Sequence, residues 1–260
     1  MTVRRLDAFA RWAAGLEWES VPEDVRELGK LQIANNLAAG MVGYASEAGA
    51  CADGLVGHAS AGPSSAFAGR DDAGFDPPTA CFVNATCSMA HDYDDYLFMG
   101  HSGHSAVFGA LAVAEAEGAG GRELLRAVCV ANELEGRLGA ASVVGPHNGQ
   151  MWAFIHRAGA AAATALLVDG GAPAIREAVA MALYSPPHPT DAGFMAGDAK
   201  LTTAAGPAAA GYRCGMMAAA GARGAEGALE GEGGFLESYP FEPLDEIFGA
   251  FGESWVARSL

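Results

Sequence analysis

Alanine dominates this chain, and the alternating runs of β-branched residues that indicate strands are almost absent. Because alanine is the best helix former among the amino acids, the apolar segments are predicted to be helices. Abundant alanine and glycine would also let neighbouring helices approach closely. The sequence therefore predicts an all-α fold, with residues 1–260 forming a single helical domain.

The expected helices span residues 6–16, 22–41, 79–91, 106–117, 122–138, 158–167, 174–183 and 203–220. Residues 45–78 are rich in Gly, Ser, Asp and Pro, and they are predicted to form a loop. The run Pro186-Pro187-His188-Pro189 interrupts the helical pattern. No repeat with a period of 20–50 residues is evident.

Composition limits the compartment and the partners. A hydrophobic content of 51% is ample for a buried core, and a net charge of −16 disfavours nucleic acid and anionic membrane surfaces. No signal segment or run of about 18 apolar residues is present. The five cysteines include no CxxC pair, which indicates reduced thiols in a cytoplasmic protein, with Cys129 and Cys214 in the core.

The main candidate site is a polar cluster that begins with the run His91-Asp92-Tyr93-Asp94-Asp95 and continues to His101 and His104. If the preceding helix runs into this cluster, Asp92 and Tyr96 share one helix face and could line a pocket. Crowding of like charges would raise the pKa of at least one carboxyl group, which suits a general acid or base. The competing interpretation is a solvated turn that caps the helix.

Further histidines lie at glycine-rich turns. His101 and His104 precede an apolar helix whose N-terminus could bind a carboxylate, although they could equally be exposed loop residues. His147 lies in a Gly/Pro loop before the next helix, and His156 and Arg157 follow as partner or surface groups.

Lysine is unusually scarce, with thirteen arginines but only two lysines, Lys30 and Lys200. Lysine can lose its charge when it is desolvated, whereas arginine cannot. Lys200 could therefore bind a carboxylate or act as an acid or base, and a simple surface position is the alternative.

Two kinds of chemistry use such groups. One is metal-free proton abstraction next to a carboxylate, with imidazole, lysine and carboxylate sharing the work. The other is a Mg²⁺ site on Asp92, Asp94 and Asp95, as in the Asp-rich, all-α prenyl-diphosphate enzymes. The second needs another metal-binding motif and basic diphosphate contacts, and the sequence offers neither.

Several segments together resemble the MmgE/PrpD family, which includes 2-methylcitrate dehydratase, cis-aconitate decarboxylase and iminodisuccinate epimerase. Residues 77–85 leading to 91–95 are similar to its most specific signature. Other similar segments are residues 31–43, 110–115, 132–138, 200–209 and 229–235. The resemblance covers nearly the whole chain.

The resemblance implies a metal-free, cofactor-free helical domain that acts on small di- or tricarboxylates by dehydration, decarboxylation or isomerisation. The family's signature aspartate, two histidines and lysine fall on Asp92, His101, His147 and Lys200. His101 and His147 would carry out acid–base steps, Asp92 would orient or share a proton, and Lys200 would bind a carboxylate or an enolate-like intermediate.

Substrate contacts are expected from three further residues, His91, Tyr96 and His104. Tyr96 stands where the family has a threonine, and His104 is additional to the family pattern. Both residues would therefore shape specificity.

Family members usually continue into a second, α+β domain, and this chain stops near where that domain would begin. A separate chain could supply the missing half, the helical domain could work alone as a homodimer, or the chain could be a binding subunit without catalysis. We expect dehydration as the reaction and a homodimer as the assembly.

Overall fold

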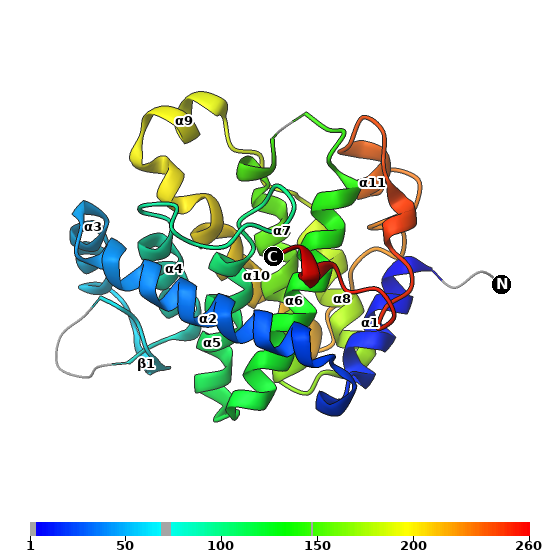
Figure 1. Cartoon of the computed structure of the whole chain (residues 1–260), viewed down its shortest axis with the longest axis horizontal. Helices are drawn as coiled ribbons and strands as arrows, with labels where there is room; N and C mark the ends of the chain where they lie inside the picture. Colours follow the sequence, from blue (N-terminus) through cyan, green and yellow to red (C-terminus); the bar gives the residue numbers. More distant parts are fainter. Residues whose placement is uncertain (1–3, 69–73, 147) are drawn as a thin grey trace.

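The computed structural model describes residues 4–68, 74–146 and 148–260. His147 therefore lies outside the described residues, and its expected role stays a prediction. The α-helices in the described part are α1 Arg5–Gly15, α2 Glu23–Tyr44, α3 Glu47–Val56, α4 Pro77–Ser88, α5 Gly103–Glu117, α6 Gly121–Ala141, α7 Ala153–Leu167, α8 Gly171–Leu183, α9 Asp191–Ala196, α10 Thr202–Ala219 and α11 Phe235–Ser238 (Figure 1). Short 3-10 helices are η1 Trp18–Ser20, η2 Gly149–Met151, η3 Asp198–Leu201, η4 Asp245–Ile247 and η5 Val256–Ser259.

The predicted all-α class is confirmed. Across the described ranges, the one named strand is β1 Ala61–Ser64, which forms isolated antiparallel bridges to Phe75 and builds no sheet. None of the helices in these ranges is long and apolar enough to cross a membrane.

Part of the predicted loop at residues 45–78 is wrong, because Glu47–Val56 forms α3. The Ser46 hydroxyl caps this helix by accepting a hydrogen bond from Ala48 N, and Ala48 and Ala52 are buried. Burial of these small side chains outweighs the poor helix propensity of the glycines in the segment.

The predicted helix over residues 79–91 is too long, because α4 ends at Ser88. Asp92 has a φ of 49°, in the left-handed region, so Asp92 and Tyr96 do not share a helix face as the sequence predicted. Beyond the end of α4, the carboxylates of Asp94 and Asp95 turn inward to partners on α5 and α2.

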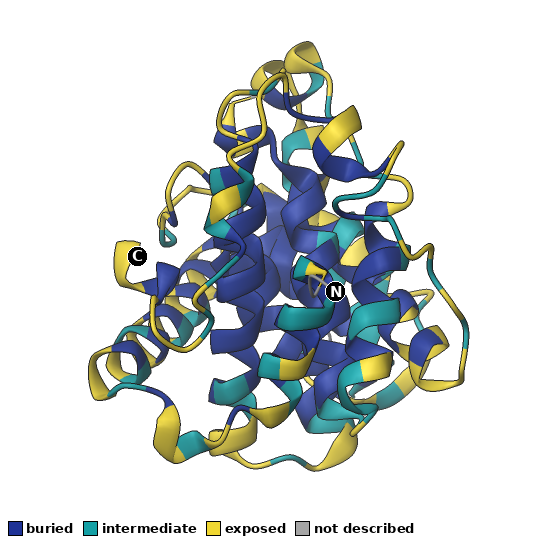
Figure 2. Ribbon diagram, turned by 90° about the vertical axis from the view of Figure 1, so that its right-hand side faces the viewer, coloured by how far each residue is buried: buried dark blue, intermediate teal, exposed yellow. Residues whose placement is uncertain are grey.

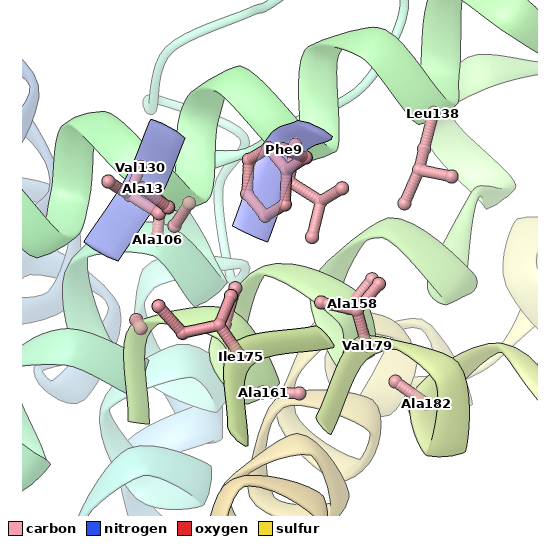
Figure 3. Close-up of a cluster of buried hydrophobic side chains, with 14 of the residues drawn as sticks. Phe9, Ala13, Ala106, Val130, Leu138, Ala158, Ala161, Ile175, Val179 and Ala182 are labelled. Atoms are coloured by element: carbon pink, nitrogen blue, oxygen red, sulfur yellow. The ribbon is translucent and has the colours of Figure 1, made fainter. Parts of the chain in front are cut away.

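Helix α7 lies at the centre of the molecule and packs against α5, α6, α8 and α10 (Figure 1). Nearly all of its side chains are buried, and Figure 2 shows that buried residues dominate the ribbons in the interior of the molecule. Figure 3 shows Ala158 and Ala161 of α7 near Ile175 and Val179 of α8, in a core that also contains larger side chains such as Phe9. The prediction that Cys129 and Cys214 are core residues is confirmed, since both are buried free thiols.

Helix α10 contacts α7 through glycines one turn apart. A Cβ at Gly211 would lie 2.3 Å from the carbonyl oxygen of Arg157, and a Cβ at Gly215 would lie 2.5 Å from Cβ of Thr164. No side chain fits at these distances, so glycine is what allows the two helices to approach this closely.

The C-terminal segment is held on α6 by Arg137, which is fully buried. Its guanidinium donates hydrogen bonds to the carbonyls of Gly249 and Ser254, at 2.9 and 2.7 Å, and to Glu133 at 2.9 Å. Glu133 in turn accepts a hydrogen bond from Ala257 N at 3.0 Å. The two side chains of a buried ion pair thus also hydrogen-bond the backbone of the C-terminal segment and fix it on α6.

Replacing Gly211 by alanine is expected to destabilise the fold by about 1–3 kcal/mol, because the new methyl group overlaps the backbone of α7. The matched control is Gly54→Ala in α3, where a Cβ meets nothing within 4 Å. That change should stabilise by up to about 1 kcal/mol through helix propensity. Urea unfolding of both variants tests this, and equal effects would contradict it.

Candidate functional site

The candidate site lies on the loop that joins α4 to α5, residues 89–102. Leu97 and Gly100 exchange two backbone hydrogen bonds, at 2.8 and 3.0 Å, and close a tight turn. The Leu97 side chain is buried against Gly136 of α6. The loop is therefore fixed to the helical core at its middle.

Asp95 fixes the second half of the loop. Its carboxylate accepts hydrogen bonds from Asn36 at 2.6 Å, Gln32 at 2.9 Å and the backbone N–H of Gly103 at 3.2 Å. A Cβ on Gly103 would lie 2.0 Å from Asp95 Oδ1, so this contact requires glycine. Asp95 thus joins α2 to the first turn of α5 and has a structural role.

Asp94 lies between two histidines, and its side chain is completely buried. Its Oδ2 is 3.0 Å from Nδ1 of His101, in hydrogen-bond geometry, and 3.1 Å from Nε2 of His104. The contact with His104 lacks the alignment of a hydrogen bond, and Asp94 Oδ1 has no hydrogen-bond partner either. The rings of His101 and His104 stack at 5.9 Å between centroids.

Burial sets the protonation of this group. Burial raises the pKa of Asp94, although the hydrogen bond from His101 opposes this. Burial lowers the pKa of His101, but the hydrogen bond and charge of Asp94, together with the charges of Asp92 and Asp95, leave that pKa raised overall. Burial holds the pKa of His104 well below its usual range.

The other ring nitrogen of His104, Nδ1, lies 2.7 Å from the hydroxyl of Ser88. Since this hydroxyl donates to the carbonyl of Ala85 at 3.0 Å, it accepts the Nδ1 proton of His104. Nε2 of a neutral His104 therefore carries a lone pair that faces Asp94.

A second polar cluster is buried beside the first. The Ser105 hydroxyl lies 2.9 Å from both carboxyl oxygens of Glu135 and 2.7 Å from Nδ1 of His156. Burial raises the pKa of Glu135 well above its usual range and lowers the pKa of His156 to about 3. The ring centroids of His104 and His156 are 6.3 Å apart, which makes the two clusters neighbours.

Lys200 comes from η3, just before α10, and its ammonium forms an ion pair with Asp92. The same ammonium lies 5.3 Å from the ring centroid of Phe194. Tyr96 packs edge-on against His101, with ring centroids 4.9 Å apart. A cavity of about 270 Å³, bordered by Ala199 and Thr202, lies next to the Lys200 segment.

The predicted residues divide into two groups. Lys200 pairs with Asp92, and Tyr96, His101 and His104 contact one another through their rings. The two sets are near enough for the charge of Asp92 to act on the pKa of His101 and that of Lys200 on the pKa of His104. His91 is instead exposed and stacks on Tyr93 at 5.4 Å between ring centroids, outside these contacts.

The three carboxylates that suggested Mg²⁺ diverge to different partners: Lys200, two histidines, and the amides on α2. Within the described ranges, the one group of at least three metal-ligand side chains is Asp94, His101 and His104, whose ligand atoms lie within 4.8 Å of one another.

Three polar residues of these clusters were missed or under-weighted by sequence reasoning: the bridging Asp94, Glu135 and His156. The usable signal was a histidine or a glutamate inside an apolar, Ala-rich helix, where an unpaired polar side chain is costly. The sequence suggests a partner or surface role for His156, and the structure shows its side chain buried.

The sequence matches the MmgE/PrpD N-terminal domain over residues 7–242. This chain belongs to the MmgE/PrpD family. The match covers most of the chain and confirms the resemblance drawn from the signature around Asp92. The match thus places the chain in a dehydratase-like or lyase-like family. A search of curated proteins finds no match to this MmgE/PrpD domain.

The buried imidazole of His156 should make the protein sensitive to acid. Its pKa falls from 6.5 to about 3 on folding, so the folded state binds fewer protons and stability is lost as the pH falls below 6.5. His156→Gln cannot titrate and should lose less stability on acidification, by about 1 kcal/mol per pH unit between pH 6.5 and 5.

The measurement is the free energy of unfolding of both proteins across this pH range. Glu135 acts in the opposite direction, because its raised pKa gives stability that is lost as the pH rises. The comparison between variant and parent removes that contribution. Parallel pH curves for the two proteins would contradict a neutral, buried His156.

Proposed function

We propose that this chain is a cofactor-free lyase or isomerase that abstracts a proton next to a carboxylate of a small metabolite. Dehydration is the favoured reaction, and decarboxylation or epimerisation uses the same first step. The observation that supports this most directly is the pairing of His101 with the buried Asp94, beside the ion pair of Asp92 with Lys200.

His101 is proposed as the base. Its Nδ1–H donates to Asp94, which fixes the tautomer and leaves Nε2 with the lone pair that can take a proton. Asp94 also stabilises the imidazolium that forms. The edge-on contact with Tyr96 restricts the ring, and His101 keeps partial exposure, 14% of its side chain, through which a substrate can reach it.

Lys200 is proposed to hold the substrate carboxylate. Removing a proton next to a carboxylate builds negative charge on its oxygens, and a preorganised ammonium stabilises that charge. Asp92 positions the ammonium in the free enzyme, and the substrate carboxylate then competes for it. His104 is proposed to shape the pocket from within, through its stack on His101.

Loss of water also needs an acid that protonates the departing hydroxyl group. His147 remains the sequence-based candidate for this step, and His91 remains a candidate for substrate contact at the rim. The electrons of the broken C–H bond form the new double bond as the hydroxyl leaves with this proton, so the step needs no oxidant or metal.

The test is proton NMR of the chelator-treated chain in D₂O with a panel of hydroxy-, unsaturated and imino-polycarboxylates. Solvent deuterium should enter the carbon next to a carboxylate, with or without loss of water or CO₂. The reaction class follows from which of these products forms. A chain that exchanges no proton in any panel member would contradict independent catalysis.

His101→Gln and Lys200→Met should each lower the exchange rate by about 10²–10⁴, the usual contribution of one acid–base group. Both retain much of the side-chain volume, and the control is His58→Gln, at an exposed histidine on a different part of the chain. Exchange rates of both variants within tenfold of the parent rate, a difference of about 1.4 kcal/mol in the barrier, would contradict the assignment of these residues to the site.

As a second proposal, the chain forms only part of a complete active site, and a partner chain supplies the rest. Four large apolar side chains are exposed on the loop around the site: Tyr93, Tyr96, Phe98 and Met99. Aromatic residues and methionine are enriched in protein interfaces. A second copy of this chain is the partner we propose, and a separate chain with the family's second domain is the alternative.

Self-association can be measured by sedimentation. Phe98→Asn should weaken the dimer at least tenfold, about 1.4 kcal/mol, since asparagine tolerates the φ of 55° at this position. The control is Tyr184→Asn, at a side chain that is exposed at the end of α8. A chain that stays monomeric and inactive would instead favour the separate second-domain chain.

A further inference from the structure

Two hydrogen-bond acceptors face each other in the buried part of the site. The Nδ1–H of His104 donates a hydrogen bond to the Ser88 hydroxyl, and the Nδ1–H of His101 donates one to Oδ2 of Asp94. One contact remains, between Nε2 of His104 and Oδ2 of Asp94 at 3.1 Å. In it the lone pair of the nitrogen faces a carboxylate oxygen, with no hydrogen atom between them. Two acceptors at this distance repel unless a positive charge lies between or beside them.

A hydrogen bond from a charged His104 does not fit this contact. The His104 side chain has no exposed surface, and its Nδ1 already pairs with the Ser88 hydroxyl. The atoms are also misaligned for such a bond, and both His104 Nε2 and Asp94 Oδ1 lack a hydrogen-bond partner. Misalignment at short range is expected when both lone pairs point to a common third atom.

We propose that Asp94, His101 and His104 bind a first-row divalent transition-metal ion such as Zn²⁺. This inference goes beyond the proposed reaction, and it stands on the geometry of the three side chains.

The ligand distances fit such an ion. Two donor atoms about 2.05 Å from one metal lie about 2.9 Å apart at a right angle and about 3.3 Å apart at the tetrahedral angle. Asp94 Oδ2 lies 3.0 Å from Nδ1 of His101 and 3.1 Å from Nε2 of His104. Two histidines and one carboxylate leave coordination positions open for water or a substrate oxygen.

The surroundings resemble those of metal-bound histidines. The nitrogen of His104 that does not face Asp94 is held by Ser88, as the outer nitrogen of a zinc-bound histidine usually is. The pKa of His101 is raised by the charges of three carboxylates, on Asp92, Asp94 and Asp95. The charge of Lys200 has the opposite effect and lowers the pKa of His104. The carboxyl groups near the two histidines outnumber the lysine near them, and such surroundings favour a cation.

A bound metal would arrest the proposed reaction. Nδ1 of His101 would bind the ion in place of its hydrogen bond to Asp94, so the histidine would lose the partner that tunes it as a base. Zn²⁺ would therefore act as an inhibitor that competes with the proton for the same lone pairs, and the metal-free protein would be the active form.

The experiment is a titration of the chelator-treated full chain with Co²⁺, followed by its visible absorption, and then displacement with Zn²⁺. One equivalent of Co²⁺ should give the intense bands of a four- or five-coordinate site. Asp94→Asn, His104→Gln and His101→Gln should each weaken binding by more than about 100-fold, whereas Ser88→Ala should cost about 10–100-fold as an outer-shell change. His58→Gln should bind as the parent does.

His101 is the least buried of the three ligands, so His101→Gln keeps the test meaningful if the other variants fail to fold. Zn²⁺ should raise the thermal midpoint of the parent and leave that of His101→Gln unchanged. Absence of Co²⁺ uptake up to millimolar concentration, or uptake that survives all three ligand variants, would overturn the proposal. These readouts do not involve turnover, so they stand apart from any failure of the proposed reaction.

Discussion

The close approach of α5, α6 and α10 to α7 is the constraint on which the rest of the structure depends. Glycine and alanine replace bulky side chains at these contacts, so the helices meet nearly backbone to backbone, as Gly211 does at Arg157. Little space remains for water, and a polar side chain within this core must find its partner on a neighbouring helix. The pairing of Ser105 with Glu135 and His156 follows from that requirement.

The same packing determines the electrostatics of the site. Burial favours the neutral forms of His104, Glu135 and His156, and it also raises the pKa of Asp94, where the hydrogen bond from His101 opposes it. His101 and Lys200 lie nearer the surface and keep charged partners. The protein therefore places a mostly neutral, proton-sharing interior behind a charged outer layer. Such an arrangement suits proton transfer, because the outer groups contact the substrate and the inner groups hold them in place.

The helical class was predictable because it follows from local composition, and the family signature led to Asp92, His101 and Lys200. Helix α3 was not predictable in this way, because the burial of Ala48 and Ala52 stabilises it and burial is a property of the tertiary structure.

The same limit explains the missed side chains. Asp94 lay inside a run of acids with nothing local to distinguish it from its neighbours. His156 and Glu135 meet through Ser105, on three different helices, and no sequence spacing encodes such a meeting. The role of His147 stays a prediction.

Arg137 links the C-terminal segment to the candidate site, because it hydrogen-bonds that segment and lies on α6. The segment that it holds, from Ile247 to Ala257, lies beyond residue 242, where the family match ends. The guanidinium and Glu133 are on α6, the helix that also carries Glu135 and Asn132. A tag, a linker or a following domain that displaced this segment would therefore disturb its hydrogen bonds to Arg137 and Glu133 on α6. Truncation at residue 242 would remove the carbonyls that accept hydrogen bonds from the buried guanidinium of Arg137. This guanidinium lies within about two helical turns of Asn132 and Glu135 of the candidate site.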